Sequence, residues 1–244
     1  MPDSFSGVSI GRVMQHPIAR IQPSSEEIYE VAGLDISGFS RQRLWLFDLE
    51  ATGLDVDRER ITQIAGVPLE GGQILEKEAF VSFVDPGRDV EIPAVVQELT
   101  GITRAQLEGA PRFPAAWQAC VEAARACTLW IGQSVFEFDV PLLEAELTRH
   151  AKPPTLPPIL DSVVLATFLL GPPAQRWSTR ALIDRFGVDI SGLRRHDALD
   201  DVKILARILV PMLDLLRREH GDRMLIPADR PLAIRRHPPV KASC

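Results

Sequence analysis

The sequence predicts an α/β domain with three layers around a mixed central sheet. Three observations lead to this class: a continuous apolar run of strand length at residues 44–47, an antiparallel meander around Gly71-Gly72, and alternating helical and strand patterns after Pro93. A continuous apolar run is typical of a strand that is buried on both faces. We therefore expect this run to lie in the middle of the sheet.

The meander is expected to contain three strands. The first is the apolar run that ends at Asp48, and the second covers residues 61–69. Gly71-Gly72 then forms a hairpin turn, and residues 73–84 make a third strand that stops at Asp85-Pro86-Gly87. These strands would form the antiparallel part of the sheet.

The remainder of the domain alternates between helices and short strands. Helical periodicity predicts helices at residues 94–99, 104–107, 114–126, 140–150, 162–170, 179–186 and 198–218. Short strands are expected at residues 128–131 and 159–160. This alternation would supply the parallel part of a mixed sheet.

Two flanking segments differ in composition from the domain, which we expect at residues 44–220. Residues 1–43 mix Ser, Pro and Gly and are interpreted as an arm with one short helix at residues 25–31, after the capping-box pattern Ser24-x-x-Glu27. Residues 221–244 hold five basic and two acidic residues and several prolines. They are expected to form an extended, mildly basic tail.

Composition excludes several classes of protein. The 244 residues carry a formal charge of −6, which argues against a protein that coats nucleic acid by charge alone but not against a nuclease that holds divalent cations. The longest nearly uncharged apolar stretch, residues 162–173, is shorter than the ~20 residues of a membrane span, so no membrane association and a cytoplasmic location are expected. Cys120 and Cys127 are separated by about 10 Å along a helix, too far for a disulfide, and Cys244 is terminal.

Three groups of residues are candidates for chemistry. Asp48 and Glu50 alternate along the first strand, so both carboxylates lie on one face, where they need hydrogen bonds or a cation. Asp139 precedes the helix at 140–150, and Asp201 heads the apolar stripe of the last helix, five residues after His196. Each group also has an ordinary interpretation: surface charge for the first, a helix cap for Asp139 and a solvated side chain for His196.

Together, the three groups resemble the motifs of the DEDDh (DnaQ-like) family of 3′–5′ exonucleases. Asp48, Glu50, Thr52 and Gly53 match the first family motif, D-x-E-x-T-G. Phe138 and Asp139 match the second motif, which ends in F-D. His196, Ala198 and Asp201 match the third motif, H-x-A-x-x-D. The resemblance covers residues 44–216 and implies an RNase H-like exonuclease fold.

The resemblance also implies a two-metal phosphodiester hydrolysis. Two Mg²⁺ or Mn²⁺ ions would be held by the four carboxylates, Asp48, Glu50, Asp139 and Asp201. His196 would be the general base that takes a proton from the attacking water. Thr52, Gly53 and Leu54 would lie close to the terminal nucleotide, and the products would be nucleoside 5′-monophosphates.

The implied substrate is the 3′ end of single-stranded DNA, in proofreading or repair, and a DNA polymerase subunit is a candidate partner. One alternative is an RNA-trimming exonuclease of the RNase T or oligoribonuclease type, because RNA and DNA are distinguished by local contacts to the 2′-hydroxyl. A second alternative is a non-catalytic adaptor that keeps the fold. The arm or the tail would then be the segment that binds a partner.

The sequence departs from the family pattern before the second motif. The family usually has His-Asn where this chain has Ser134-Val135, which puts one substrate-side contact in doubt, and Glu137 is an alternative ligand to Asp139. Thr100 stands where the family usually has a histidine. Candidate phosphate or base contacts, each with an ordinary surface or core role as its alternative, are Arg176, Trp177, Arg180, Arg185, Arg194 and Arg195.

Overall fold

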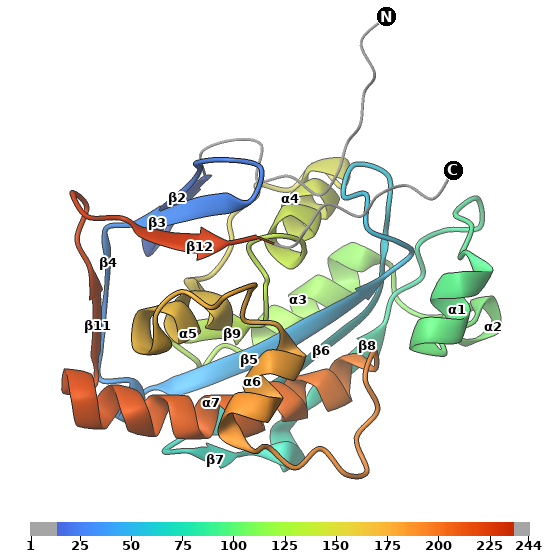
Figure 1. Ribbon diagram of the computed structural model, residues 1–244. Coiled ribbons are helices and arrows are strands. Elements are labelled where there is room, and N and C mark those ends of the chain that lie inside the picture. Colours follow the sequence, from blue (N-terminus) through green and yellow to red (C-terminus); the bar gives the residue numbers. More distant parts are fainter. Residues whose placement is uncertain (1–13, 237–244) are drawn as a thin grey trace, which may run out of the picture.

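A six-stranded mixed sheet forms the centre of the computed structural model, which describes residues 14–236 (Figure 1). Its strands are β5 (Arg43–Ala51), β6 (Ile61–Glu70), β7 (Gln73–Ile74), β8 (Phe80–Phe83), β9 (Leu129–Gly132) and β10 (Ile159–Asp161). The order is β10-β9-β5-β6-β7, and β8 pairs with β6. Strand β5 is antiparallel to β6 and parallel to β9, which is itself parallel to β10. The predicted mixed α/β class is confirmed.

Helices accompany this sheet. They are α1 (Ala94–Thr100), α2 (Arg104–Leu107), α3 (Phe113–Ala123), α4 (Asp139–Arg149), α5 (Ser162–Leu170), α6 (Thr179–Phe186) and α7 (Ala198–His220). Helices α1 to α3 lie between β8 and β9 in the chain, α4 lies between β9 and β10, and α5 to α7 follow β10. Helix α7 contacts β5 and β6, and α3 contacts β6 and β8 (Figure 1). The helices expected after Pro93 are therefore all present, with ends that differ by up to three residues from the prediction.

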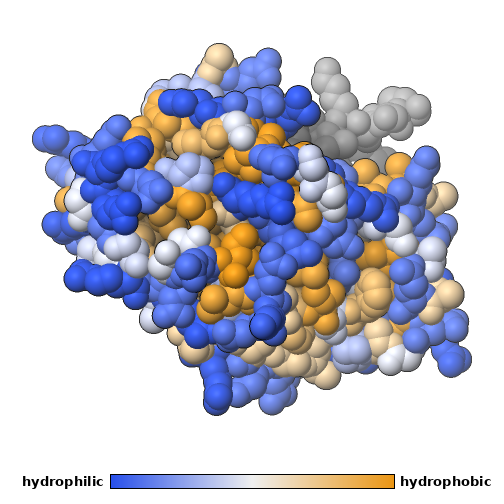
Figure 2. All heavy atoms as spheres, turned by 90° about the horizontal axis from the view of Figure 1, so that it is seen from below, coloured by the Kyte–Doolittle hydropathy of each residue, from blue (hydrophilic) through white to orange (hydrophobic). Residues whose placement is uncertain are grey.

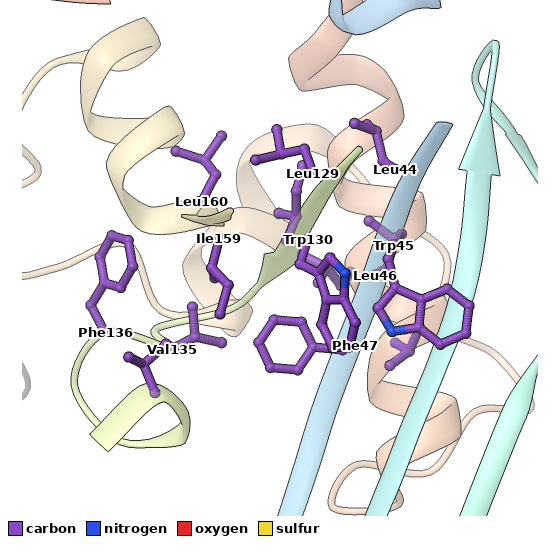
Figure 3. Packing of buried hydrophobic residues seen from close by; sticks show 14 of the residues in the cluster. Leu44, Trp45, Leu46, Phe47, Leu129, Trp130, Val135, Phe136, Ile159 and Leu160 are labelled. Atoms are coloured by element: carbon purple, nitrogen blue, oxygen red, sulfur yellow. The ribbon is translucent and has the colours of Figure 1, made fainter. Parts of the chain in front are cut away.

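The core is built around the apolar run of β5. Trp45 is fully buried, and its ring centroid lies 5.9 Å from that of Trp130 on β9, which in turn lies 5.4 Å from Phe47 (Figure 3). Gly66 on β6 leaves room for this packing, because a Cβ at that position would lie 2.3 Å from the Trp45 ring. Buried aromatic rings supply large apolar area, so β5 is anchored firmly in the sheet that carries the first candidate motif.

The predicted third strand is interrupted. Instead of one strand over residues 73–84, the chain forms β7, the 3-10 helix η2 (Glu76–Glu78) and β8. The interruption falls on the charged sequence Glu76-Lys77-Glu78. Three consecutive charged side chains do not alternate with apolar ones, so this stretch has no buried face to hold it in the sheet.

The segment before the domain forms strands and not a helix. The predicted helix at residues 25–31 is wrong: the amides of Ser24 and Ser25 donate to the Ile28 carbonyl in a turn, and β3 (Ile28–Ala32) follows. Tyr29 and Val31 are buried, whereas Ile28 and Glu30 are half-buried, which is the period of a strand. The capping-box pattern was therefore outweighed by β-branched and aromatic residues that pack on one face.

Both flanks of the domain are joined by strand pairing. A four-stranded sheet, here called the flanking sheet, has the order β1-β2-β3-β12 and contains β1 (Met14–His16), β2 (Ala19–Pro23), β3 and β12 (Leu232–Arg235). A separate pair joins β4 (Leu34–Ser37) to β11 (Arg223–Ile226), and the 3-10 helix η1 (Phe39–Arg41) follows β4. The expected extended tail is thus paired at residues 223–226 and 232–235, while its end and the start of the arm lie outside the described residues. The boundaries at 43 and 220 stay a prediction.

Figure 2 shows the face of the molecule that points downward in Figure 1, and on this face apolar and polar patches are mixed. A groove beside β7 and the middle of α7 is lined by Ile74, Phe186, Val188, Val210 and Pro211, among others, and by none of the candidate site residues. Within residues 14–236, no helix is both long and apolar enough to cross a bilayer. Cys120 and Cys127 are free, as expected, and Cys244 lies outside the described residues.

Candidate active site

Strand β5 presents Asp48 and Glu50 on the same face. They stand opposite Ala65 and Gln63 of β6, and the regular register ends between Glu50 and Ala51. The strand is held by its buried neighbours on both sides, so the two carboxylates project from a rigid element. A rigid element positions metal-binding or catalytic groups more precisely than a loop does.

The start of α7 brings His196 and Asp201 to the same place. The Asp197 carboxylate caps the helix by accepting the Asp200 amide N–H at 3.1 Å. His196 adopts a left-handed backbone with φ 62°, and its N–H donates to Asp201 Oδ2 at 2.9 Å. The Ala198 amide donates to Gln63 Oε1 at 3.3 Å. This last bond ties the helix start to β6 beside Glu50.

Asp139 is the first residue of α4 and does not cap it. The N-cap position is Phe138, and no side chain caps this helix. Asp139 is 6% exposed, and the backbone N–H groups of Leu49 and of Asp139 itself favour its ionised form. Because Leu49 lies between Asp48 and Glu50, this carboxylate faces the same end of β5 as they do.

The four carboxylates repel one another. Burial and then the charges of Asp139, Glu50 and Asp201 raise the pKa of Asp48 well above its usual value. Burial, followed by the charges of Asp201 and Asp139, raises the pKa of Glu50 to about 8. Burial also raises the pKa of Asp139 to about 7 and that of Asp201, where Arg195 opposes the shift. We call these four residues the acid cluster.

The acid cluster fits a divalent cation. Glu50, His196 and Asp201 each offer a ligand atom, and these atoms lie within 4.8 Å of one another. Asp201 Oδ1 lies 2.8 Å from Arg195 Nη1, but it is a buried oxygen that accepts no well-directed hydrogen bond from the part of the chain that the structure describes. Buried carboxylates in excess over nearby cations are the ligand set that hard divalent ions prefer.

His196 is suited to accept a proton. Burial, followed by the charge of Arg195, lowers the pKa of its imidazole, and this outweighs the opposite effect of Asp201. A lowered pKa keeps the ring neutral near pH 7, and a neutral imidazole has a free nitrogen lone pair.

The structure separates Glu137 from Asp139. Glu137 is 5% exposed, and its charge raises the pKa of Tyr29 and Asp161, whereas the charge of Asp139 raises the pKa of Asp48 and Glu50. The charge of Asp161 also raises the pKa of Asp139, so the two carboxylates have a common neighbour, but it is Asp139 whose charge acts on Asp48 and Glu50 and that belongs with the acid cluster.

The unusual residue Val135 is part of the core. It is buried and lies so close to Gly132 that a Cβ there would be 2.2 Å from Val135 Cγ1 (Figure 3). Its side chain therefore packs against β9 and offers no polar contact where the family usually has asparagine.

Thr52, Gly53 and Leu54 lie on the loop that follows β5. The Thr52 hydroxyl is buried, donates to Glu59 and accepts the Arg60 amide at 3.0 Å. Gly53 lies against the same carboxylate, since a Cβ there would be 2.9 Å from Glu59 Cδ. Leu54 is 51% exposed. Of the three, Leu54 alone presents a large apolar side chain to solvent.

The candidate basic and aromatic residues have varied surroundings. Arg195 faces the acid cluster, whereas Arg180 is exposed and pairs with Asp184 at 3.0 Å. The Trp177 indole N–H donates to the Gly171 carbonyl, and burial lowers the pKa of Arg176 beside Glu137. Arg195 is thus paired with a carboxylate of the site, and the charge of Arg194 also acts on His196. Sequence reasoning missed Gln63, whose amide becomes informative only when β6 and α7 are placed together.

Comparison with known proteins agrees with this geometry. Residues 45–209 match the RNase_T family model, which is described as "Exonuclease". The chain belongs to this exonuclease family. Its resemblance to the DEDDh exonucleases and its expected enzyme class are thereby confirmed.

Relatives and solved structures of the family cover the same part of the chain. DNA polymerase III subunit epsilon of Aquifex aeolicus is 31% identical over 176 residues, or 72% of this chain and 83% of that protein. DNA polymerase III PolC-type of Streptococcus pyogenes is 31% identical over 181 residues, which are 74% of this chain and 12% of that much longer protein. The nuclease domain of 3′hExo, a DEDDh family member bound to rAMP, has a TM-score of 0.64 at 19% identity and covers 73% of this chain and 94% of that one. Exonuclease I of E. coli in a complex with single-stranded DNA gives 0.56 at 19%, covering 74% and 42%.

Proposed function

We propose that this exonuclease removes nucleotides one at a time from the 3′ end of single-stranded DNA. The observation that carries the proposal is the acid cluster beside His196. Its four carboxylates come from β5, α4 and α7, and their raised pKa values reflect a charge that calls for cations. Groups with perturbed pKa values at one site are typical of catalytic centres.

Each site residue has a role in this proposal. Asp48, Glu50, Asp139 and Asp201 would hold Mg²⁺ or Mn²⁺, and such ions stabilise the charge on the attacking and leaving oxygens of a phosphodiester. An imidazole nitrogen of His196 takes the proton from the attacking water. Thr52 and Gly53 shape the loop after β5, and the exposed Leu54 packs against the last base. These steps release a nucleoside 5′-monophosphate.

DNA is favoured over RNA by the named relatives. The two described above at 31% identity are DNA polymerase III proteins, whereas 3′hExo, bound to rAMP, is 19% identical. A role in proofreading or repair, with a DNA polymerase subunit as the partner, follows from the same likeness. RNA trimming is the second candidate, because a structural neighbour of the fold binds a ribonucleotide.

A degradation assay tests the proposal. The purified protein is mixed with 5′-labelled single-stranded DNA or with RNA of the same sequence, in Mg²⁺, Mn²⁺ or EDTA. We expect a ladder that shortens from the 3′ end, requires metal and proceeds faster on DNA. Asp48→Asn should slow it about 100-fold or more, because one misplaced group in a catalytic site costs a factor of this size.

Asp214→Asn is the matched control. The Asp214 side chain is half-exposed on α7 and pairs with Arg217 at 2.8 Å, in the second half of the helix and away from Asp201. Its activity should equal that of the wild type. Faster degradation of RNA would select the trimming enzyme, and intact DNA and RNA in every metal would reject the exonuclease proposal in favour of an adaptor.

A further inference from the structure

Asp161 makes an unusual set of hydrogen bonds at the end of β10. Its carboxylate is fully buried and accepts three backbone N–H groups: Ser134 at 3.0 Å and Val163 at 2.9 Å on Oδ1, and Phe136 at 3.1 Å on Oδ2. The Val163 bond caps helix α5. The other two bonds join Asp161 to the loop between β9 and α4, and the capping of α5 does not require them.

This loop, residues 133–138, leads directly into Asp139. Ser134 has a left-handed backbone with φ 60°, the Glu137 amide donates to the Ser134 carbonyl at 3.1 Å, and the Val140 amide donates to the Val135 carbonyl at 2.9 Å. A left-handed serine is uncommon and is kept only where its surroundings hold it. The Asp161 carboxylate supplies that hold, since it binds the amides on both sides of Val135.

The bonds end on a fully buried carboxylate, and hydrogen bonds to buried groups are strong and costly to lose. Burial raises the pKa of Asp161 to about 7, and the three N–H groups oppose this by favouring the carboxylate. The flanking sheet covers the same loop: the rings of His16 and Phe136 have centroids 5.6 Å apart, and the charge of Asp161 raises the pKa of the buried Tyr29. β12 of this sheet also contacts α5 (Figure 1).

We propose that Asp161 is a positioning residue of the exonuclease site: by holding the Ser134 and Phe136 amides, it fixes the direction in which Asp139 enters the acid cluster. This inference rests on the proposed function. Asp161 acts through the loop backbone and touches no reacting atom. The charge of Asp161 also raises the pKa of Asp139, so the supporting carboxylate lies near the one that it positions.

The isosteric change Asp161→Asn tests the proposal. One amide oxygen can keep the bonds to Ser134 and Val163, and so the cap on α5, but the NH₂ group then faces the Phe136 N–H and that bond is lost. We expect weaker Mn²⁺ binding in calorimetry and a kcat that is lower by a factor of about 10 to 100, with KM for a DNA oligonucleotide within about twofold. Amide hydrogen exchange in residues 133–138 should become faster.

Asp189→Asn is the matched control. One carboxylate oxygen of Asp189 also accepts a backbone N–H, that of Ser191 at 2.8 Å, but it does so in an exposed loop. Its Mn²⁺ affinity, kcat and exchange in residues 133–138 should equal those of the wild type. Asp161→Ala, which loses all three bonds, should show the larger loss if it folds.

Three results would overturn the proposal. They are an unchanged Mn²⁺ affinity and kcat in a folded Asp161→Asn protein, an equal loss in Asp189→Asn, and fast exchange of the Ser134 and Phe136 amides in the wild type. The last measurement needs no variant to fold. If the wild type degrades neither DNA nor RNA, the proposed function fails, while Mn²⁺ affinity and hydrogen exchange still decide whether Asp161 positions Asp139.

Discussion

The raised pKa of Glu50 shows how the acid cluster affects the stability of the folded protein without metal. Its pKa of about 8 arises from burial and from the charges of Asp201, Asp139 and Asp197. A carboxyl group in an unfolded chain titrates near pH 4. Between these two pH values the folded protein binds more protons than the unfolded chain does, because carboxyl groups of the acid cluster stay protonated in the folded state and are ionised in the unfolded state.

The metal-free protein should therefore lose stability as the pH rises from about 4 to about 8. In this range each group with a raised pKa is protonated in the folded state and ionised in the unfolded state, so raising the pH favours unfolding. Mn²⁺ should restore stability, and more so at pH 8 than at pH 5, because binding no longer has to displace protons. Urea unfolding at both pH values, with EDTA or Mn²⁺, measures the effect.

Glu50→Gln is the control for this titration. It removes one of the shifted groups, so the decline with pH in EDTA should be smaller than in the wild type. An equal decline in both proteins would assign the pH dependence to groups outside the acid cluster.

The sequence predicts which residues form the site better than it predicts the contacts that these residues make. The motif spacing names Asp48, Glu50, Asp139, His196 and Asp201, and the structure brings them together. The motifs say nothing of Gln63 or Asp161 as partners of the site, because each contacts it across the fold and not along the chain. Their roles depend on distances that only the packed sheet and helices define.

Among the secondary-structure elements, the start of α7 is the one that positions Asp201. Asp197 caps the helix, the left-handed His196 turns the chain just before it, and Gln63 ties its first residue to β6. The position of Asp201 is thus a property of the helix terminus. A change that loosens this turn should move Asp201 without touching it.

Asp197→Ala and Asp197→Ser separate the cap from the charge. Both remove a negative charge beside Glu50, but serine can still accept the Asp200 N–H. We expect the alanine protein to be less stable than the serine protein by about 1 kcal/mol in urea unfolding and to bind Mn²⁺ more weakly. Equal Mn²⁺ affinities in the two variants would mean that the charge, and not the helix terminus, matters for binding.

Elements with one strong pattern are predicted well, and elements with two competing patterns are not. The periodic helices and the apolar strand β5 were expected near their observed bounds. In contrast, β3 was expected to be helical, because Ser24 and Glu27 match a helix start while Tyr29 and Val31 alternate as in a strand. Local pattern cannot decide such a case, since the choice is made by β2 and β12 on either side of β3.

On the scale of the whole molecule, the flanks and the domain share one hydrophobic core. Ile21, Tyr29 and Val31 from the first flank and Ile234 from the second are buried in the same cluster as β5 and α7. The composition of the flanks suggested appendages, because the strand pairing that buries these residues joins distant parts of the chain. We therefore expect the flanks to unfold together with the domain.

Ile234→Ala tests this unity. Ile234 is fully buried on β12, so its truncation should cost about 2–5 kcal/mol. Tryptophan fluorescence, which reports on the core around Trp45, and far-UV circular dichroism should shift together to lower urea. Leu225→Ala on the exposed side of β11 is the control and should change stability by less than about 0.5 kcal/mol. An unchanged fluorescence transition in Ile234→Ala would indicate that the flanking sheet melts separately.

The pairing of β3 with β12 also has a consequence for synthesis on the ribosome. β3 emerges early, but the strand that covers its second edge follows about 200 residues later, which takes about 10–40 s at ordinary translation rates. Throughout that time β3 offers an open edge, the kind of edge that invites pairing with other chains. The flanking sheet, which covers the loop that leads to Asp139, is completed last. A nascent chain therefore contains all the motif residues of the nuclease before this sheet has formed.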